Sequence, residues 1–255
     1  MLDSLTALAR DASAMMLSAM APAVHDKEGH FNFTTDTDLE IQEYLREKLK
    51  ALKPEAQFFA EEQVNASLTD GPAFVVDPID GTVNFSRKRN ASAVSIAFLE
   101  NRLPLMGVVM DPFRNELFTA VRGKGACLNG VPVHVSPTPL SRALVNFGSS
   151  PYDDDLRTLS LRALGAFLES AGDVRRSGSA ALDLCDVACG RSDVFFELRL
   201  RPWDVAAGSL IVMEAGGIYR SLDHDSPCYD APCGVFACSP ACEEAWDILQ
   251  RALRP

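Results

Sequence analysis

The sequence lacks any run of about eighteen apolar residues, the length that a membrane-spanning helix requires. It also lacks an excess of positive charge, because 24 Lys and Arg stand against 35 Asp and Glu and give a net charge of −11. Nucleic-acid binding needs surplus Lys and Arg, so we expect no nucleic-acid partner. Near the N-terminus, Asp3, Arg10 and Asp11 interrupt the apolar residues, which does not fit a signal peptide. We therefore expect a cytoplasmic protein with no membrane segment.

Pairs of the form Cys-x-x-Cys, which are typical of zinc sites, are also absent, although the chain contains seven cysteines. Cys185 and Cys189 lie four residues apart on a predicted helix and are interpreted as small core residues. The spacings near the C-terminus match zinc ligands poorly, so we expect no structural zinc at Cys228, Cys233, Cys238 and Cys242.

The length of 255 residues and the hydrophobic content of 47% are sufficient for a large core. No internal repeat, low-complexity stretch or long linker divides the chain. We therefore expect one domain over 1–255, with an N-terminal lobe over about 1–140 and a C-terminal lobe over about 141–255.

Hydrophobic periodicity predicts a mixture of helices and strands. We expect helices over residues 2–20, 37–49, 156–171, 180–189, 205–215 and 243–253. We expect strands over residues 58–60, 74–76, 91–99, 105–110, 116–121, 144–147, 194–197 and 234–238. The strands from 91 to 121 follow one another closely enough to form an antiparallel meander. Helices and strands do not alternate strictly, which favours α+β layers over a doubly wound sheet.

The segment VVDPIDGTVNF at residues 75–85 carries the clearest chemical signal. Asp77 and Asp80 lie three residues apart across Pro78, whose ring restricts the backbone and holds the carboxylates at a set spacing. A helix that begins at Thr82 would present free amides to an anion. Two carboxylates repel a phosphate unless hard cations lie between them, so the pattern indicates Mg²⁺ bound between carboxylate and phosphate. In isolation, the same residues would also fit an ordinary surface turn.

Further charged residues can converge with this segment. Glu61 and Glu62 end a predicted strand just before it, and Asp204 stands at the start of a helix. Taken alone, Asp204 would also fit a helix N-cap, and Lys27 would fit a solvated lysine in a polar loop. Their combination with the first motif favours a metal site.

Together these residues resemble the inositol monophosphatase family of Mg²⁺-dependent, lithium-sensitive phosphatases. The strongest similarity lies in DPIDGTVNF at 77–85 and WDVAAGSLIVMEAGG at 203–217. Weaker similarity runs through TTDTD at 34–38, AVSIAF at 93–98, GKGACLNG at 123–130 and GSAALDL at 178–184. The resemblance implies a layered α/β/α/β/α sandwich of the inositol monophosphatase and fructose-1,6-bisphosphatase type, and a homodimer.

By position, the resemblance implies two or three Mg²⁺ ions. It places the first on Glu61, Asp77 and the Ile79 carbonyl, and the second on Asp77, Asp80 and Asp204. It implies that Thr82, with Glu61, orients the attacking water, that the amides of Gly81 and Thr82 bind phosphate oxygens, and that Lys27 belongs to a mobile loop. The residues implied to contact the alcohol part of the substrate are Asp80, Ser149, Gly178, Ser179, Ala180, Glu197 and Asp204.

The expected activity is Mg²⁺-dependent hydrolysis of a small phosphorylated polyol, with inositol monophosphate as the first candidate. Arg201, before Pro202, departs from the inositol-specific animal enzymes and is expected to bind a second anionic group, although it would also fit a surface residue paired with acids. Alternative substrates within the family are fructose 1,6-bisphosphate, NADP, histidinol phosphate and 3′-phosphoadenosine nucleotides. An alternative of another class is a non-catalytic, RNA-polymerase-associated regulatory protein on the same fold.

Overall fold

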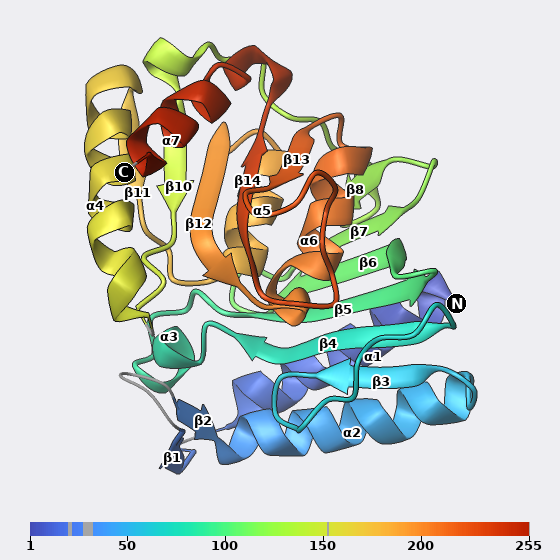
Figure 1. The fold of residues 1–255 in the computed structure, drawn as a ribbon. Coiled ribbons are helices and arrows are strands. Elements are labelled where there is room, and N and C mark those ends of the chain that lie inside the picture. Colours follow the sequence, from blue (N-terminus) through green and yellow to red (C-terminus); the bar gives the residue numbers. More distant parts are fainter. Residues whose placement is uncertain (20–21, 28–32, 152, 255) are drawn as a thin grey trace.

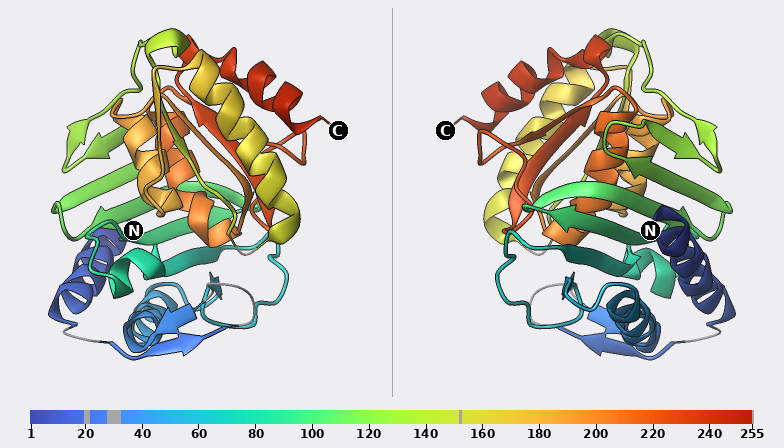
Figure 2. Two further views of the ribbon diagram at one scale, coloured as in Figure 1. Left: turned by 90° about the vertical axis from the view of Figure 1, so that its left-hand side faces the viewer. Right: turned by 90° about the vertical axis from the view of Figure 1, so that its right-hand side faces the viewer.

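The computed structural model describes residues 1–19, 22–27, 33–151 and 153–254. Helices and sheets alternate in five layers, as the ribbon in Figure 1 and the side views in Figure 2 show. The predicted α+β sandwich is therefore confirmed. Within the described residues, no helix is long and apolar enough to cross a membrane.

The first layer consists of helices α1 (Leu2–Ser18) and α2 (Asp36–Leu52), which pack on one face of a seven-stranded sheet. Their buried residues recur every three or four positions, as in Leu5, Ala9, Ala12 and Met16, so each helix presents one apolar stripe to the sheet. A two-stranded hairpin of β1 (Val24–Asp26) and β2 (Phe33–Thr35) lies between the two helices in the chain.

The seven-stranded sheet has the strand order β3-β4-β5-β6-β7-β8-β9. Its strands are β3 (Gln57–Ala60), β4 (Ala73–Asp80), β5 (Ala93–Glu100), β6 (Leu103–Asp111), β7 (Glu116–Val121), β8 (Ala126–Leu128) and β9 (Val131–Pro132), with the short helix α3 (Thr82–Ser86) after β4. Strands β4 to β7 pair antiparallel in chain order, which confirms the predicted meander.

Helices α5 (Ala180–Ala188) and α6 (Pro202–Glu214) form the middle layer and are buried between the two sheets. The second sheet has the order β11-β10-β12-β14-β13, with β10 (Leu144–Phe147), β11 (Asp173–Arg175), β12 (Val194–Leu200), β13 (Ile218–Ser221) and β14 (Cys233–Cys238). Helices α4 (Asp154–Ser170) and α7 (Ala245–Leu253) cover its outer face, where Phe167 and Leu249 are buried. One-turn 3-10 helices span Leu140–Arg142 and Pro240–Cys242.

A bulge in β4 determines where the carboxylates of the DPID motif point. Asp77 pairs with Ser95 and Asp80 with Ala93, so three steps along β4 oppose only two along β5. In a regular strand, side chains three residues apart lie on opposite faces; the extra residue brings them to the same face. The strand expected to end at residue 76 therefore continues to Asp80, and the bulge replaces the expected turn at Pro78.

The elements that the sequence did not reveal are mostly short strands: β1, β2, β8, β9, β11 and β13 have two to four residues each. Strands this short carry too few residues for an alternating pattern. Helix α6 also begins at Pro202, before the expected start at Val205, because proline is favoured in the first helical turn, where no intrahelical N–H bond is lost.

The approach of α6 to the first sheet depends on glycine. A Cβ on Gly107 of β6 would lie 2.8 Å from the carbonyl oxygen of Ala207 in α6, whereas a Cβ on Gly165 of α4 would meet nothing within 4 Å. We expect Gly107→Ala to destabilise the fold by about 1–3 kcal/mol through overpacking. Gly165→Ala is the matched control and should stabilise it by up to about 1 kcal/mol through helix propensity.

Urea unfolding of both variants measures the two effects. Equal midpoints for Gly107→Ala and the wild type would contradict a tight contact between β6 and α6.

Candidate metal and phosphate site

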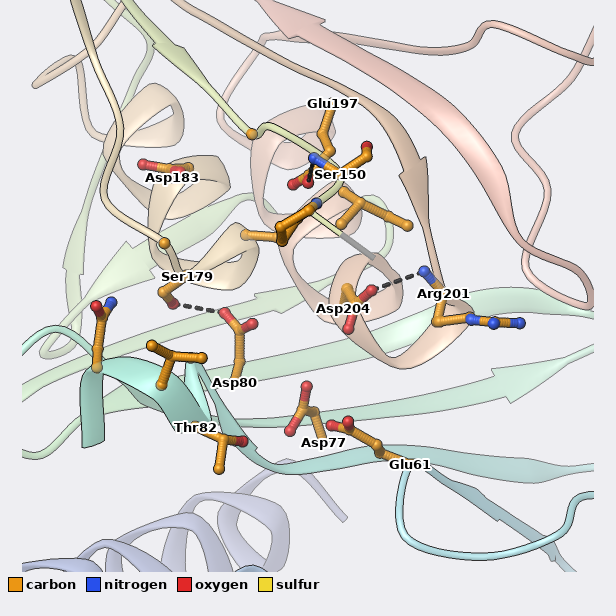
Figure 3. A pocket seen from close by; sticks show the side chains of 18 of the residues that line it. Glu61, Asp77, Asp80, Thr82, Ser150, Ser179, Asp183, Glu197, Arg201 and Asp204 are labelled. Carbon is orange, nitrogen blue, oxygen red and sulfur yellow. Dashed lines mark hydrogen bonds between the residues drawn. The ribbon is translucent and has the colours of Figure 1, made fainter. Parts of the chain in front are cut away.

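Three carboxylates from two layers meet in one cavity. Asp77 and Asp80 come from β4, and Asp204 comes from the first turn of α6. One oxygen of each lies within 4.8 Å of the others. Glu61 follows β3, and its side chain points toward Asp77 in Figure 3. All four line a cavity of about 700 Å³.

Backbone and hydroxyl donors hold these carboxylates in place. Asp77 Oδ1 accepts the Ile79 N–H at 3.0 Å, and Asp204 Oδ2 accepts the Arg201 N–H at 2.6 Å. Asp80 Oδ2 accepts the Ser179 hydroxyl at 2.5 Å and the Ala181 N–H at 2.7 Å. In each carboxylate, one oxygen accepts these hydrogen bonds and fixes the orientation of the group. The other oxygen remains available to a ligand in the cavity.

The electrostatics of this cluster call for a cation. Burial, reinforced by the neighbouring carboxylates, raises the pKa of Asp77 and of Asp204 well above 3.8. Burial also raises the pKa of Asp80, to about 6, against hydrogen bonds that lower it. Within the described residues, no side-chain nitrogen of a Lys or Arg forms an ion pair with these three carboxylates. A buried, all-oxygen cluster without a counter-charge fits a hard divalent ion, which is the group that its donor set prefers.

Lys27 reaches the edge of the same cavity. Its Nζ lies 3.0 Å from Glu61 Oε1 and 2.5 Å from Glu62 Oε1. Burial lowers the pKa of Lys27, but the two carboxylates outweigh it and leave the pKa raised. The lysine therefore places a positive charge beside Glu61 at the edge of the cavity.

Thr82 connects the cavity to Asp38, a residue that the sequence reasoning did not single out. The Thr82 hydroxyl lies 3.0 Å from Asp38 Oδ1 and 3.1 Å from the Ile79 carbonyl oxygen. Asp38 is fully buried, and burial raises its pKa to about 6. It also forms a capping box with Thr35 at the start of α2. The spacing Thr-x-x-Asp predicts such a box, but gives no indication that Asp38 reaches a site.

Another buried carboxylate, Glu197, lies in the cavity wall away from the cluster. Glu197 Oε1 accepts the Ser150 N–H at 2.8 Å, and burial raises the pKa of Glu197 to about 7. A Cβ on Gly148 would lie 1.8 Å from Glu197 Oε2, so any larger residue there would have to displace the Glu197 carboxylate. Glu197 thus stands in the cavity wall, where its carboxylate can face the alcohol part of a ligand.

All the site residues expected from the sequence line the cavity except Ile79 and Ser149. The Ile79 side chain is buried, and its carbonyl accepts from Thr82. The Ser149 hydroxyl accepts a hydrogen bond from Arg176 Nε at 3.1 Å, while its neighbour Ser150 lines the cavity. Other lining residues that the sequence did not indicate include Gly148, Pro151, Asp153, Arg176, Asp183 and Arg199.

Comparisons with known proteins identify the family of this chain. A model of the inositol monophosphatase family matches residues 1–252. The Nus factor SuhB of Xylella fastidiosa is 42% identical over 195 residues, which cover 75% of this chain and 70% of that protein. An inositol-1-monophosphatase of a Synechocystis species is 38% identical over 220 residues, 85% of this chain and 76% of that protein. The structure of an inositol monophosphatase from an Anabaena (Nostoc) species matches with a TM-score of 0.83 at 32% identity, over 99% of this chain and 94% of that chain.

The protein is thus a layered α+β sandwich that holds a buried cluster of carboxylates between its sheets. The chain belongs to the inositol monophosphatase family.

Without a cation, the carboxylate cluster should destabilise the fold. The folded-state pKa of Asp204 is raised, so above its ordinary value of 3.8 the folded protein binds more protons than the unfolded chain, and stability falls as the pH rises. In EDTA at about pH 8, we therefore expect Asp204→Asn to raise the thermal midpoint, and to raise it less at about pH 5. The amide oxygen of Asn can still accept the Arg201 N–H.

Glu116→Gln is the control, because Glu116 pairs with Arg191 and its pKa is lowered by that hydrogen bond. This change should leave the midpoint unchanged or lower it. An Asp204→Asn midpoint below that of the wild type at both pH values would show that repulsion within the cluster is not a significant term.

Proposed function

We propose that the protein is a Mg²⁺-dependent phosphomonoesterase that hydrolyses a small phosphorylated polyol to the alcohol and inorganic phosphate. The observation that carries this proposal is the buried cluster of Asp77, Asp80 and Asp204, which has no protein counter-charge within the described residues and opens into a cavity of about 700 Å³. Family membership supports a phosphatase. Assays of phosphate release from a panel of phosphate esters, with and without Mg²⁺, test this proposal directly.

In this proposal, Glu61, Asp77 and the Ile79 carbonyl hold one Mg²⁺, and Asp77, Asp80 and Asp204 hold another, with two or three ions in all. When bound, these ions supply an activated water and neutralise the negative charge of the phosphate and of the leaving oxygen. Asp77 could contribute to both, because the pairing of β3 with β4 places Glu61 beside it and the bulge in β4 turns Asp80 to the same face.

The chain's own residues orient the reactants. With its proton donated to Asp38, the Thr82 hydroxyl can accept a hydrogen bond from the attacking water and direct it at phosphorus. The amides of Gly81 and Thr82 stand at the start of α3, where helical N–H groups lack intrahelical partners, and bind phosphate oxygens. A side chain at position 81 would approach the Gly178 carbonyl to 3.1 Å, and a φ of 87° there favours glycine.

The alcohol part of the substrate lies against Ser179, Ala180, Glu197 and Gly178 in this proposal. Glu197 has one oxygen engaged by Ser150, so the other can accept a hydrogen bond from a polyol hydroxyl. Inositol monophosphate is the first candidate, and fructose 1,6-bisphosphate, NADP, histidinol phosphate and 3′-phosphoadenosine nucleotides are the alternatives. We further propose a cytoplasmic homodimer.

One observation favours a second function. A relative that is 42% identical carries the name Nus factor SuhB, so we also propose a regulatory, RNA-polymerase-associated role as the alternative. A scaffold of this kind would have no need of a buried carboxylate cluster, because such a cluster destabilises the fold without an ion. The cluster therefore favours the enzyme.

The first activity prediction concerns the metal. Asp204→Asn should keep the fold but lower the turnover of the best substrate by about a hundredfold or more, the loss expected when a charge-stabilising group is removed. Phosphate release in Mg²⁺ and in EDTA measures this loss, and Glu116→Gln, which is remote from the cavity, serves as the control. Full activity of Asp204→Asn, or of the wild type in EDTA, would contradict the metal-dependent proposal.

The second activity prediction concerns lithium. Asp77, Asp80 and Asp204 form a site of side-chain carboxylates alone, which a small, hard monovalent ion such as Li⁺ can enter after turnover. We expect roughly tens of millimolar LiCl to inhibit hydrolysis in saturating Mg²⁺, by analogy with the family. A dose series with NaCl at equal ionic strength is the control. Equal effects of the two salts would argue for a different second metal site.

A further inference from the structure

Arg176 brings a positive charge to the cavity, although the chain has a net charge of −11. Arg176 lines the cavity, and the exposed loop 87–89 (Arg-Lys-Arg) follows α3, whose residue Asn84 also lines it. Asn84 joins the two segments, because its Nδ2 donates to the carbonyl oxygens of Ala91 at 2.8 Å and Ser177 at 3.0 Å. We call Arg87, Lys88, Arg89 and Arg176 the basic rim.

Arg176 differs from the arginines beside it. Arg175 pairs with Asp173 at 2.6 Å, and Arg199 pairs with Asp153 across the cavity wall. Within the described part of the chain, no carboxylate lies within 4.0 Å of any side-chain nitrogen of the basic rim. The side-chain hydrogen bond of Arg176 goes from Nε to Ser149 Oγ, so both Nη groups remain for a ligand.

The position of Arg176 matches the far end of a bound phosphate ester. It lies three residues before Ser179, whose hydroxyl contacts Asp80, and three residues span at most about 11 Å. Glu197 lies near Arg176, because Glu197 Oε1 accepts the Ser150 N–H at 2.8 Å and the adjacent Ser149 hydroxyl accepts from Arg176 Nε at 3.1 Å. A substrate with its reactive phosphate at Asp80 and its hydroxyls at Glu197 would therefore extend toward Arg176.

We propose that Arg176 binds a second anionic group of the substrate, a phosphate or carboxylate at the far end of its alcohol part, and that the loop 87–89 attracts this group electrostatically. A guanidinium can form two parallel hydrogen bonds to either group. This inference rests on the proposed phosphomonoesterase function and deepens it. Among the candidate substrates, it favours the doubly anionic esters over inositol monophosphate.

Arg201 is the rival for this role, since it also lines the cavity and forms no ion pair within the described residues. In Figure 3 its side chain extends from the end of β12 away from Ser179 and Glu197. It thus lies on the other side of Asp204 from the alcohol part of the substrate. Separate variants of Arg176 and Arg201 distinguish the two.

The test uses fructose 1,6-bisphosphate and fructose 1-phosphate, which differ only in the second phosphate. We expect the wild type to have the higher kcat/KM for the bisphosphate. In Arg176→Ala, that preference should fall by about tenfold to a hundredfold, the range for a hydrogen bond to a charged group. The fall should lie mainly in KM, because the second phosphate does not change in the reaction. Hydrolysis of fructose 1-phosphate should change by less than about threefold.

Arg175→Ala is the matched control and should keep the wild-type preference, because Arg175 is held by Asp173. The proposal is overturned if Arg176→Ala weakens both esters equally, if it changes neither, or if Arg201→Ala rather than Arg176→Ala removes the preference. Thermal midpoints of all three variants exclude unfolding as the cause.

The proposed activity can fail separately. If the wild type hydrolyses other esters but neither fructose ester, the two fructose esters are tested as inhibitors of its best substrate. The ratio of their inhibition constants then measures the preference for the bisphosphate. We expect this preference to fall in Arg176→Ala by the same roughly tenfold to hundredfold. If it releases phosphate from no ester, the phosphomonoesterase proposal is wrong. Calorimetric titration with fructose 1,6-bisphosphate in Mg²⁺ then tests the Arg176 site, and equal binding by the wild type and Arg176→Ala overturns it.

Discussion

Negative charge buried between two sheets is the constraint on which the rest of the structure depends. Asp77, Asp80 and Asp204 are drawn together by the fold, although burial and mutual repulsion oppose their ionisation. Hydrogen bonds to one oxygen of each carboxylate offset part of this unfavourable energy. Within the described residues, however, the ammonium group of Lys27 pairs with Glu61 and Glu62 and not with these three carboxylates. Such a cluster is unfavourable for folding and favourable for binding a cation, which is the trade expected at a functional site.

Two backbone features produce this cluster. The bulge in β4 turns Asp77 and Asp80 to the same face of the first sheet, and the early start of α6 brings Asp204 over that face. Helix α6 can come so close because Gly107 leaves room for the Ala207 carbonyl. Sheet register and helix packing thus determine where the three carboxylates lie in the cavity.

The sequence predicted the layered fold and the residues of the cluster because both depend on local patterns and on long, distinctive motifs, DPIDGTVNF and WDVAAGSLIVMEAGG. It did not predict the bulge, since proline followed by two further residues fits a turn equally well. Nor did it reveal Asp38, whose contact with Thr82 joins positions 44 residues apart. Ser150 in place of Ser149 shows the same limit: one residue in a loop decides which side chain faces the cavity, and no periodicity specifies it.

The two ends of the cavity have opposite electrostatic character, and this difference bears on substrate choice. At the floor, carboxylates dominate and require cations before any phosphate can approach. At the basic rim, arginine and lysine side chains lack carboxylate partners in the described structure and can meet an anion directly. Glu197 lies between these regions, where a neutral donor such as a hydroxyl group can satisfy its carboxylate without a further charge. A molecule that satisfies all three regions carries a phosphate at one end, hydroxyls in the middle and a second anionic group at the other end.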